Sequence, residues 1–370
     1  MKNLIYIVVC ILLISCKQDK KQEQQDAAST PEVAQWLTYE GSEENGQHIV
    51  LISGDEEYRS EEALPQLAKI LSQHHGFKCT VLFAQHPDKP GIVNANYVEN
   101  IAGLEVLEQA DMMFIFTRFR ALPDDQMAHI DNYLMSGKPV VGIRTSTHAF
   151  NFSETSTSKY THYSNGYAGE KTEWTDGFGR LVLGEKWISH HGHHKHQSTR
   201  GVIAPGNEQH EITNGLAAGD IWGSTDVYGV RLPLPGDSEP IILGQVVNRA
   251  GEYDEEDIWY GMQPTDSEVA MVNNQGVDVS APLMPIAWTK SYQLPGGSPG
   301  RAFASTIGSS SDLLTEGVRR LLINGAYWAM ELPVPPKANV DLVGDYNPTQ
   351  YEFRDDAYWE ERQMKIADLE

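Results

Sequence analysis

The stretch HIVLISGDEEYRSEEALPQLAKIL, residues 48–71, decides the fold. Residues 47–53 form an apolar run that ends at Gly54 and predicts a buried strand. Apolar residues then recur at helical spacing as far as Leu71, with Gly76 as a stop signal and Pro65 expected in the first turn of the helix. A buried strand followed directly by an amphipathic helix is typical of a parallel α/β sheet.

The same alternation continues along the chain. Apolar runs at 77–84, 111–116 and 139–143 predict strands, and an amphipathic pattern around 127–134 predicts a helix. We therefore expect an α/β fold with a doubly wound, mostly parallel sheet and helices on both faces. Shorter strands are expected at 200–204, 226–230, 240–246, 285–292 and 301–306, before a last helix from about 314 to 330. Neither a repeat nor a clean linker divides residues 47–331, which predicts one α/β domain.

The composition of the chain excludes some classes of function. The chain has 370 residues, of which 40% are hydrophobic, enough for a sizeable core. It carries 28 Lys and Arg against 51 Asp and Glu, a formal net charge of −23. This excess of acid argues against binding nucleic acid, or a membrane surface by electrostatics.

The N-terminus predicts export and lipidation. Residues 1–15 combine Lys2 with an apolar run too short to span a bilayer, as in a signal peptide, and the run ends in a segment that resembles a bacterial lipoprotein box at Cys16. We expect cleavage before Cys16, lipidation of its thiol and a flexible tether over 16–46. The mature chain would then sit in the bacterial cell envelope, facing the periplasm or the cell surface. Only Cys79 would remain in the body, as a buried small hydrophobe, which excludes an internal disulfide and disfavours a cysteine nucleophile.

The C-terminal segment, residues 332–370, lacks a sustained period after its prolines. We expect an extended arm that lies on the domain through Tyr346, Tyr351 and Phe353, and a loose tail is the alternative.

Polar side chains gather where the predicted strands end. In parallel sheets, ligands bind beyond the carboxyl ends of the strands. Three such ends here carry acids, arginines and a histidine together, and we expect them to form a ligand site. The candidate residues are Asp55, Glu56, Glu57, Tyr58, Arg118, Arg120, Arg144 and His148. The alternative is that these are ordinary solvated loops.

The most unusual segment is WISHHGHHKHQSTR, residues 187–200, with five histidines. His191 and His193 are spaced to share one side of an extended strand, and with Asp226 they are candidate ligands for a divalent metal such as zinc. A metal-free catalytic or sugar-binding cluster and a solvated, pH-responsive loop are the alternatives. Trp222, Asp226 and Tyr228 pair aromatic faces with an acid, as carbohydrate sites do.

The sequence lacks the motifs of nucleotide-binding proteins and of one class of serine hydrolase. Neither G-x-G-x-x-G nor a Walker loop follows the first strand, and G-x-S-x-G does not occur. The sequence therefore supports neither nucleotide binding nor a serine hydrolase of that type.

Taken together, several blocks resemble the trehalose-utilisation, or ThuA-like, family over about residues 48–330. They are the opening quoted above, FTRFRALPDDQMAHIDNYLMSGKPVVGIRTSTHAF, LGEKWISHHGHHKHQSTRG, GDIWGSTDVYGVRLPLPGD, and PIAWTK followed by GRAFASTIG. The resemblance implies a flavodoxin-like fold similar to class I glutamine amidotransferases. Those enzymes place a cysteine where this chain has Arg144, so amidotransfer through a thioester is excluded.

The resemblance implies sugar catabolism, alongside an oxidoreductase that makes 3-keto-glycosides. A 3-keto group acidifies the C2–H, so a base can remove that proton and expel the group at C1. The expected roles are a base at His191 or His193, with His148 as another imidazole, and enolate stabilisation by Arg118 and Arg144. Asp55, Glu56 or Glu57 would position hydroxyls or act as the acid. Further sugar contacts are expected from Tyr58, Arg120, Trp222, Asp226 and Tyr228.

Two functions stay open at this point. One is a lipid-anchored enzyme acting on glycosides or 3-keto-glycosides. The other is a non-catalytic carbohydrate-binding lipoprotein that has lost amidotransferase chemistry.

Overall fold

A computed structural model describes residues 33–42 and 45–370, and residues Ala34–Glu370 form one compact unit. The predicted signal peptide and Cys16 lie outside the described residues. Within those described ranges, none of the helices is both long and apolar enough to cross a membrane.

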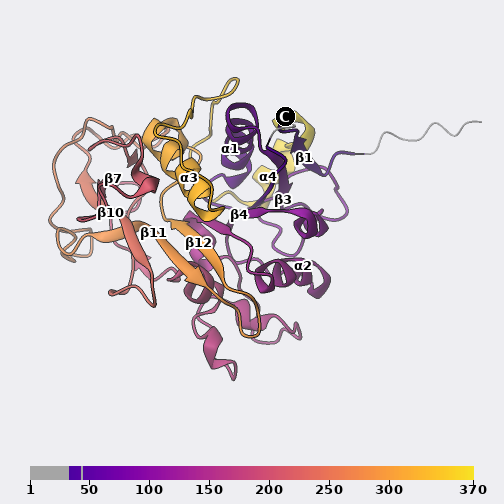
Figure 1. Cartoon of the computed structure of the whole chain (residues 1–370). Helices are drawn as coiled ribbons and strands as arrows, with labels where there is room; N and C mark the ends of the chain where they lie inside the picture. Colours follow the sequence, from indigo (N-terminus) through magenta and orange to yellow (C-terminus); the bar gives the residue numbers. More distant parts are fainter. Residues whose placement is uncertain (1–32, 43–44) are drawn as a thin grey trace, which may run out of the picture. The chain divides into compact units, whose positions relative to one another are not determined.

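A ten-stranded sheet runs through this unit (Figure 1). Five neighbouring strands are parallel and stand in the order β3-β2-β4-β5-β12. Renumbered along the chain, this is the order 2-1-3-4-5 of flavodoxin-like folds. The bounds of these strands are β2 His48–Gly54, β3 Lys78–Phe83, β4 Met112–Thr117, β5 Val140–Ile143 and β12 Gly300–Ser305.

The second half of the chain extends this sheet with antiparallel strands. Beyond β12 the order is β11-β10-β7-β8, and β1 pairs antiparallel with β3 at the other edge. The predicted α/β class is confirmed, and the sheet is mixed. These strands are β1 Trp36–Tyr39, β7 Gln197–Ile203, β8 Trp222–Gly223, β10 Glu239–Asn248 and β11 Met284–Tyr292, and a separate pair joins β6 Ser189–His190 to β9 Tyr228–Gly229.

Helices cover both faces of the sheet, as predicted. In Figure 1, α1 (Ser60–His75) and α3 (Glu316–Ala329) lie on one side, and α2 (Asp124–Met135) lies on the other. Strand β2 alternates accordingly: Ile49 and Leu51 pack in the core under α1 and α3, whereas Val50 and Ile52 pack under α2. A Cβ on Gly325 of α3 would lie 2.3 Å from Phe303 of β12, so glycine allows this helix to approach the sheet.

Three local expectations were wrong. Helix α1 begins at Ser60, so Pro65 lies in its second turn. The flexible tether predicted over 16–46 is wrong for Trp36–Tyr39. These residues form β1, which pairs with β3 and buries the side chain of Leu37. The C-terminal segment also contains a helix that its weak periodicity concealed, α4 (Asp356–Arg362), with Trp359 buried.

The C-terminal arm lies on the domain rather than hanging free. Tyr351 is completely buried, and its ring stacks on that of Tyr58 with centroids 5.3 Å apart. Tyr346 donates to the carbonyl of Ser310 at 2.7 Å. Phe353 is different, because 52% of its surface is exposed. The arm is therefore a fixed part of the fold that presents one aromatic ring to solvent.

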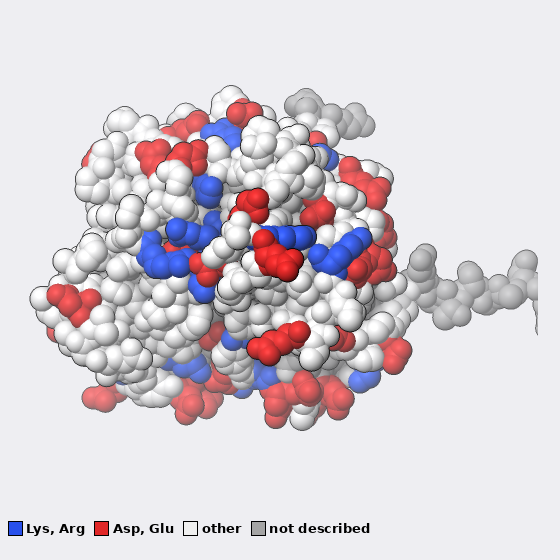
Figure 2. Space-filling view, turned by 90° about the horizontal axis from the view of Figure 1, so that it is seen from below, with Lys and Arg blue, Asp and Glu red and all other residues white. Residues whose placement is uncertain are grey.

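Charge is mixed on the surface. On the face shown in Figure 2, Lys and Arg side chains are interspersed with Asp and Glu. Cys79 is buried and unpaired, as the sequence predicted.

Candidate functional site

Residues from the carboxyl ends of the strands line a cavity of about 380 Å³. Its walls combine aromatic rings with two cationic side chains, three imidazoles and one carboxyl: Glu57, Arg118, Phe119, His148, Trp187, His190, His194, Lys195, Tyr228 and Phe353. The flavodoxin-like topology places ligands at this edge.

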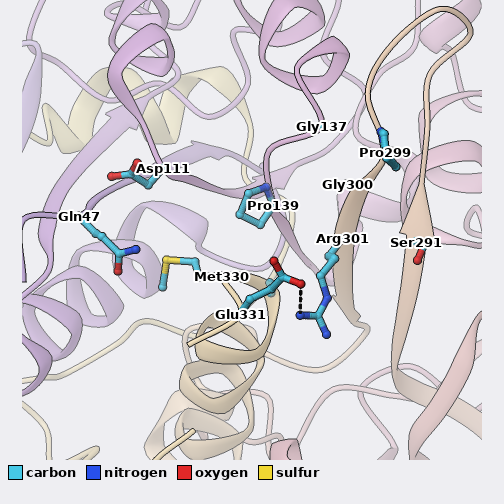
Figure 3. Close-up of a pocket in the computed structure, with 11 residues that line it drawn as sticks. Gln47, Asp111, Gly137, Pro139, Ser291, Pro299, Gly300, Arg301, Met330 and Glu331 are labelled. Carbon is cyan, nitrogen blue, oxygen red and sulfur yellow. Dashed lines mark ion pairs between the residues drawn. The ribbon is translucent and has the colours of Figure 1, made fainter. Parts of the chain in front are cut away.

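A larger hollow of about 540 Å³ lies at the opposite edge, where strands begin (Figure 3). Gln47 and Asp111 precede β2 and β4, and Arg301 forms an ion pair with Glu331 at 3.4 Å. Among the described residues that line it, none is an imidazole or a thiol. We therefore place the candidate site in the smaller cavity.

Asp226 organises the two histidines of that cavity. Nδ1 of His190 lies 2.8 Å from its Oδ2, and Nδ1 of His194 lies 3.0 Å from its Oδ1. Because a carboxylate can only accept, each imidazole donates through Nδ1–H, which leaves Nε2 as the basic nitrogen. Burial alone would raise the pKa of Asp226, but Arg144 and the two histidines outweigh it and hold the pKa well below its usual range.

The same contacts shift the pKa values of the two imidazoles in opposite directions. Burial lowers the pKa of His190, but its bond to Asp226 outweighs this effect, and the pKa is raised. Burial dominates at the more enclosed His194 and lowers its pKa. Nε2 of His194 lies 3.3 Å from Glu57, whereas the side chain of His190 is 39% exposed. His190 is therefore the better placed of the two to reach a ligand.

Arg144 lies behind Asp226 rather than in the cavity. Its guanidinium donates to Oδ1 of Asp226 at 3.0 Å, to the Asp226 carbonyl at 2.7 Å and to the Thr306 carbonyl at 2.6 Å. It also stacks on the rings of Tyr58 and Tyr228, at 4.4 and 3.7 Å from their centroids. Arg144 is thus completely buried, and its charge fixes Asp226.

Glu57 comes from the turn between β2 and α1. Asp55 shapes this turn by accepting from the backbone N–H groups of Glu57 and Tyr58 and from the hydroxyl of Thr145. The turn places the Glu57 carboxyl in the cavity wall, where burial, with a smaller contribution from Asp55, raises its pKa to about 7. Glu57 is therefore a carboxylic acid poised to give up a proton near neutral pH.

A second group of ion pairs contributes Arg118 to the cavity wall. Glu56 accepts from Arg118 and, at 2.7 Å, from Arg120. Arg120 is completely buried and also donates to three backbone carbonyls, whereas Arg118 reaches the cavity with its side chain 22% exposed. Of these two arginines, Arg118 is therefore the one available to a ligand.

His148 lies deep in the same cavity. Its ring lies 5.0 Å from that of Phe119 and 5.6 Å from that of Trp187. Burial, followed by the charge of Arg118, lowers its pKa well below the ordinary value. His148 is therefore a neutral imidazole.

The prediction that His191 and His193 share one side of a strand is wrong. Strand β6 ends at His190, and a turn over residues 191–196 follows, so alternation across a strand does not apply. His191 points toward Val279, and His193 stacks on His196 with centroids 4.1 Å apart. The turn instead brings His190 and His194 together, with centroids 4.9 Å apart.

Other predicted site residues support the walls from behind. Asp55, Tyr58, Arg120 and Arg144 are completely buried. Trp222 is a core residue that packs against Trp259 and donates to Ser198. Of the predicted residues, the ones that line the cavity are Glu57, Arg118, His148 and Tyr228.

The sequence reasoning missed His190 and His194, although both stand in the motif it singled out. It also missed the cavity roles of Lys195 and Phe353. The sequence signal that could have found these histidines was Asp226. A carboxylate predicted to bind a metal or a sugar beside aromatic residues needs histidine partners close to it. Which histidines face it depends on pairing His190 with Tyr228 across β6 and β9.

A divalent metal has one candidate set within the described ranges. Ligand atoms of His190, His194 and Asp226 lie within 4.8 Å of one another. However, both oxygens of Asp226 already accept from imidazoles, and Oδ1 also accepts from Arg144. A metal on Asp226 would have to break these bonds, so the residues fit an acid–base cluster better than a first coordination shell. The prediction of a zinc-like cofactor stays a prediction.

Comparisons with known proteins give fold similarity. No family model and no curated protein matches the sequence. A crystal structure from Parabacteroides merdae, of a protein named provisionally as ThuA-like, is similar with a TM-score of 0.43, 15% identity, 83% of this chain covered and 97% of that chain. A second provisionally named ThuA-like protein, from Bacteroides uniformis, gives a TM-score of 0.41, 13% identity and coverage of 76% and 91%.

Proposed function

We propose that this chain is a lipid-anchored, ThuA-like protein of carbohydrate catabolism that acts on glycosides or 3-keto-glycosides by base-assisted elimination or hydrolysis. One observation carries the proposal. An imidazole oriented by Asp226 and a carboxyl with a pKa of about 7 meet in one aromatic-walled cavity, together with a partly exposed arginine. Aromatic walls suit the C–H faces of a sugar ring, and the polar groups suit its hydroxyls.

The elimination assigns a role to three side chains. Nε2 of His190 takes the C2 proton of a 3-keto-glycoside, and the electron pair forms an enolate whose oxygen Arg118 stabilises. The enolate then restores the ketone as the C1–O bond breaks and a C1=C2 double bond forms. The Glu57 carboxyl gives its proton to the departing oxygen. His190 ends protonated and Glu57 ionised, so one proton transfer between them resets the site.

The test compares two histidines of the same loop. The untagged mature chain is incubated with a panel of glycosides and their 3-keto derivatives, and NMR follows the products. His190→Gln should lower kcat/KM for the keto-sugars by about a hundredfold or more. His193→Gln is the matched control, because that ring lies outside the cavity against His196. Equal turnover in both variants would remove His190 from the mechanism.

Two further arms separate the alternatives. Turnover that a chelator abolishes, and added zinc restores, would establish the divalent metal and displace His190 as the base. Saturable binding of an intact sugar without product would make the chain a carbohydrate-binding lipoprotein, which the aromatic walls also suit.

Envelope localisation is part of the proposal and has its own test. Cys16 should incorporate labelled fatty acid in bacterial cells, and Cys16→Ser should abolish that label. An unlabelled wild-type chain would reject the anchor without affecting the site.

A further inference from the structure

The C-terminal arm supplies the outer wall of the cavity. The backbone N–H of Glu352 donates to the Glu57 carbonyl at 2.8 Å, and the Arg59 guanidinium donates to the carbonyls of Gln350 and Glu352 at 3.2 and 2.6 Å. Tyr260 also donates to the Tyr351 carbonyl. The segment before Phe353 is thus tied by its backbone to the turn that carries the acid.

Phe353 stands out against this well-packed segment. It is 52% exposed, although Tyr351 two residues earlier is completely buried. Its ring lines the cavity, and the Arg118 guanidinium lies over it at 4.8 Å from its centroid, and over the ring of Phe119 at 4.6 Å. Exposing a large apolar ring costs free energy, and here a fixed backbone holds that ring at the cavity mouth.

The position of the ring relative to the acid indicates what it contacts. Among the lining residues His148 is almost inaccessible, whereas Arg118 and Phe353 are partly exposed. A sugar ring that presents C2 to His190 and its leaving oxygen to Glu57 would direct the leaving group along the arm that is bonded to Glu57. In that pose the leaving group would pass Phe353, because the bond from Glu352 to the Glu57 carbonyl holds the arm beside the turn that carries the acid.

We propose that Phe353 is a specificity residue that stacks on the leaving group, so that the site prefers glycosides whose leaving group offers a flat apolar face, such as an aryl ring or a second sugar. This inference rests on the proposed function. A stacked aromatic pair contributes beyond its buried area, enough for a preference of about three- to tenfold over a leaving group too small to stack.

The test measures binding and turnover separately. Calorimetry of the full mature chain gives Kd for phenyl and methyl glucosides of both anomers and for a glucose disaccharide. NMR gives kcat and KM for the 3-keto forms. Wild type should bind the phenyl glucoside and the disaccharide about three- to tenfold more tightly than the methyl glucoside. Phe353→Ala should abolish that preference through KM with little change in kcat for the methyl substrate, and Phe353→Trp should retain it.

Two controls keep the result interpretable. Tyr253→Ala removes an exposed ring outside the cavity and should leave the preference unchanged. Phe353→Leu keeps apolar bulk without a π face and should lose most of the preference. A preference that Phe353→Ala leaves intact, or wild type without any preference, overturns the inference even if turnover is normal. A Phe353-dependent preference without turnover would uphold the inference and refute the elimination chemistry.

Discussion

Replacing Glu57 by glutamine should make the protein more stable in alkali and inactive. Glu57 is buried in the cavity wall beside Asp55, and these two effects raise its pKa from 4.5 to about 7, while the charges of Arg118, Arg144 and His190 oppose the change. A carboxyl whose pKa is higher in the folded than in the unfolded state holds its proton more tightly when folded. The folded protein therefore loses stability as pH rises from 4.5 through 7, and the full cost is present above 7.

The magnitude follows from the two pKa values. At about 1.4 kcal/mol for each pH unit, the difference between 4.5 and about 7 corresponds to about 3 kcal/mol. Glutamine resembles the protonated carboxyl in shape and cannot ionise. The free energy of unfolding of Glu57→Gln should therefore rise relative to wild type by most of this amount between pH 5 and pH 9.

The assay is urea denaturation at several pH values, followed by circular dichroism. Glu154→Gln is the matched control, since it removes one carboxyl from an exposed loop and corrects for the change in net charge. Turnover of the keto-sugar should fall by about a hundredfold in Glu57→Gln alone. The free energy of unfolding of Glu57→Gln is plotted against pH beside that of wild type. If the two curves stay parallel from pH 5 to pH 9, Glu57 does not have a raised pKa and is not the acid.

Four more outcomes follow from the geometry. The profile of kcat/KM should be bell-shaped with its optimum near pH 7, since His190 must be neutral and Glu57 protonated, and a flat profile between pH 5 and pH 9 would contradict both roles. Arg144→Lys should cost about 3–5 kcal/mol in urea denaturation, because a single ammonium cannot replace the buried guanidinium bonds. Gly179→Ala should cost about 3 kcal/mol or more, because its Cβ would lie 1.9 Å from a backbone carbonyl, and a thermal shift measures this. Deleting residues 346–370 should give unfolded chain by circular dichroism, since it removes three buried apolar side chains at about 2 kcal/mol each.

Local patterns predicted the parallel strands β3, β4 and β5 because each is a continuous, mostly apolar run. The runs at 77–84, 111–116 and 139–143 match β3, β4 and β5 closely. Strand β1 was missed because it lies at an edge of the sheet, is not a continuous apolar run and directly follows a polar segment of the sequence. The pattern within a short edge strand is weak, and only its pairing with β3 identifies it.

The predicted site residues divide into those that line the cavity, such as Glu57, Arg118 and His148, and those that do not, such as His191 and His193. Glu57, Arg118 and His148 were predicted because they follow the ends of strands, which is a local feature of the sequence. His190 and His194 depend on where a two-residue strand stops, and that is set by its partner at Tyr228. Phe353 depends on an arm that returns to the first turn of the fold across almost 300 residues of chain, so spacing within the sequence could not reveal it.

Arg144 explains why the polar groups of the cavity lie beside the elbow rather than on it. Its φ of 46° is the left-handed conformation that a nucleophile at a strand–helix elbow adopts, and for a residue with a Cβ it costs free energy. In an enzyme with a nucleophile there, that strain exposes a reactive atom. Here the guanidinium turns inward, and its bonds to Asp226 and Thr306 offset the strain. The elbow thus supplies a fixed positive charge, which keeps Asp226 ionised, and the ionised carboxylate directs two imidazoles toward the cavity.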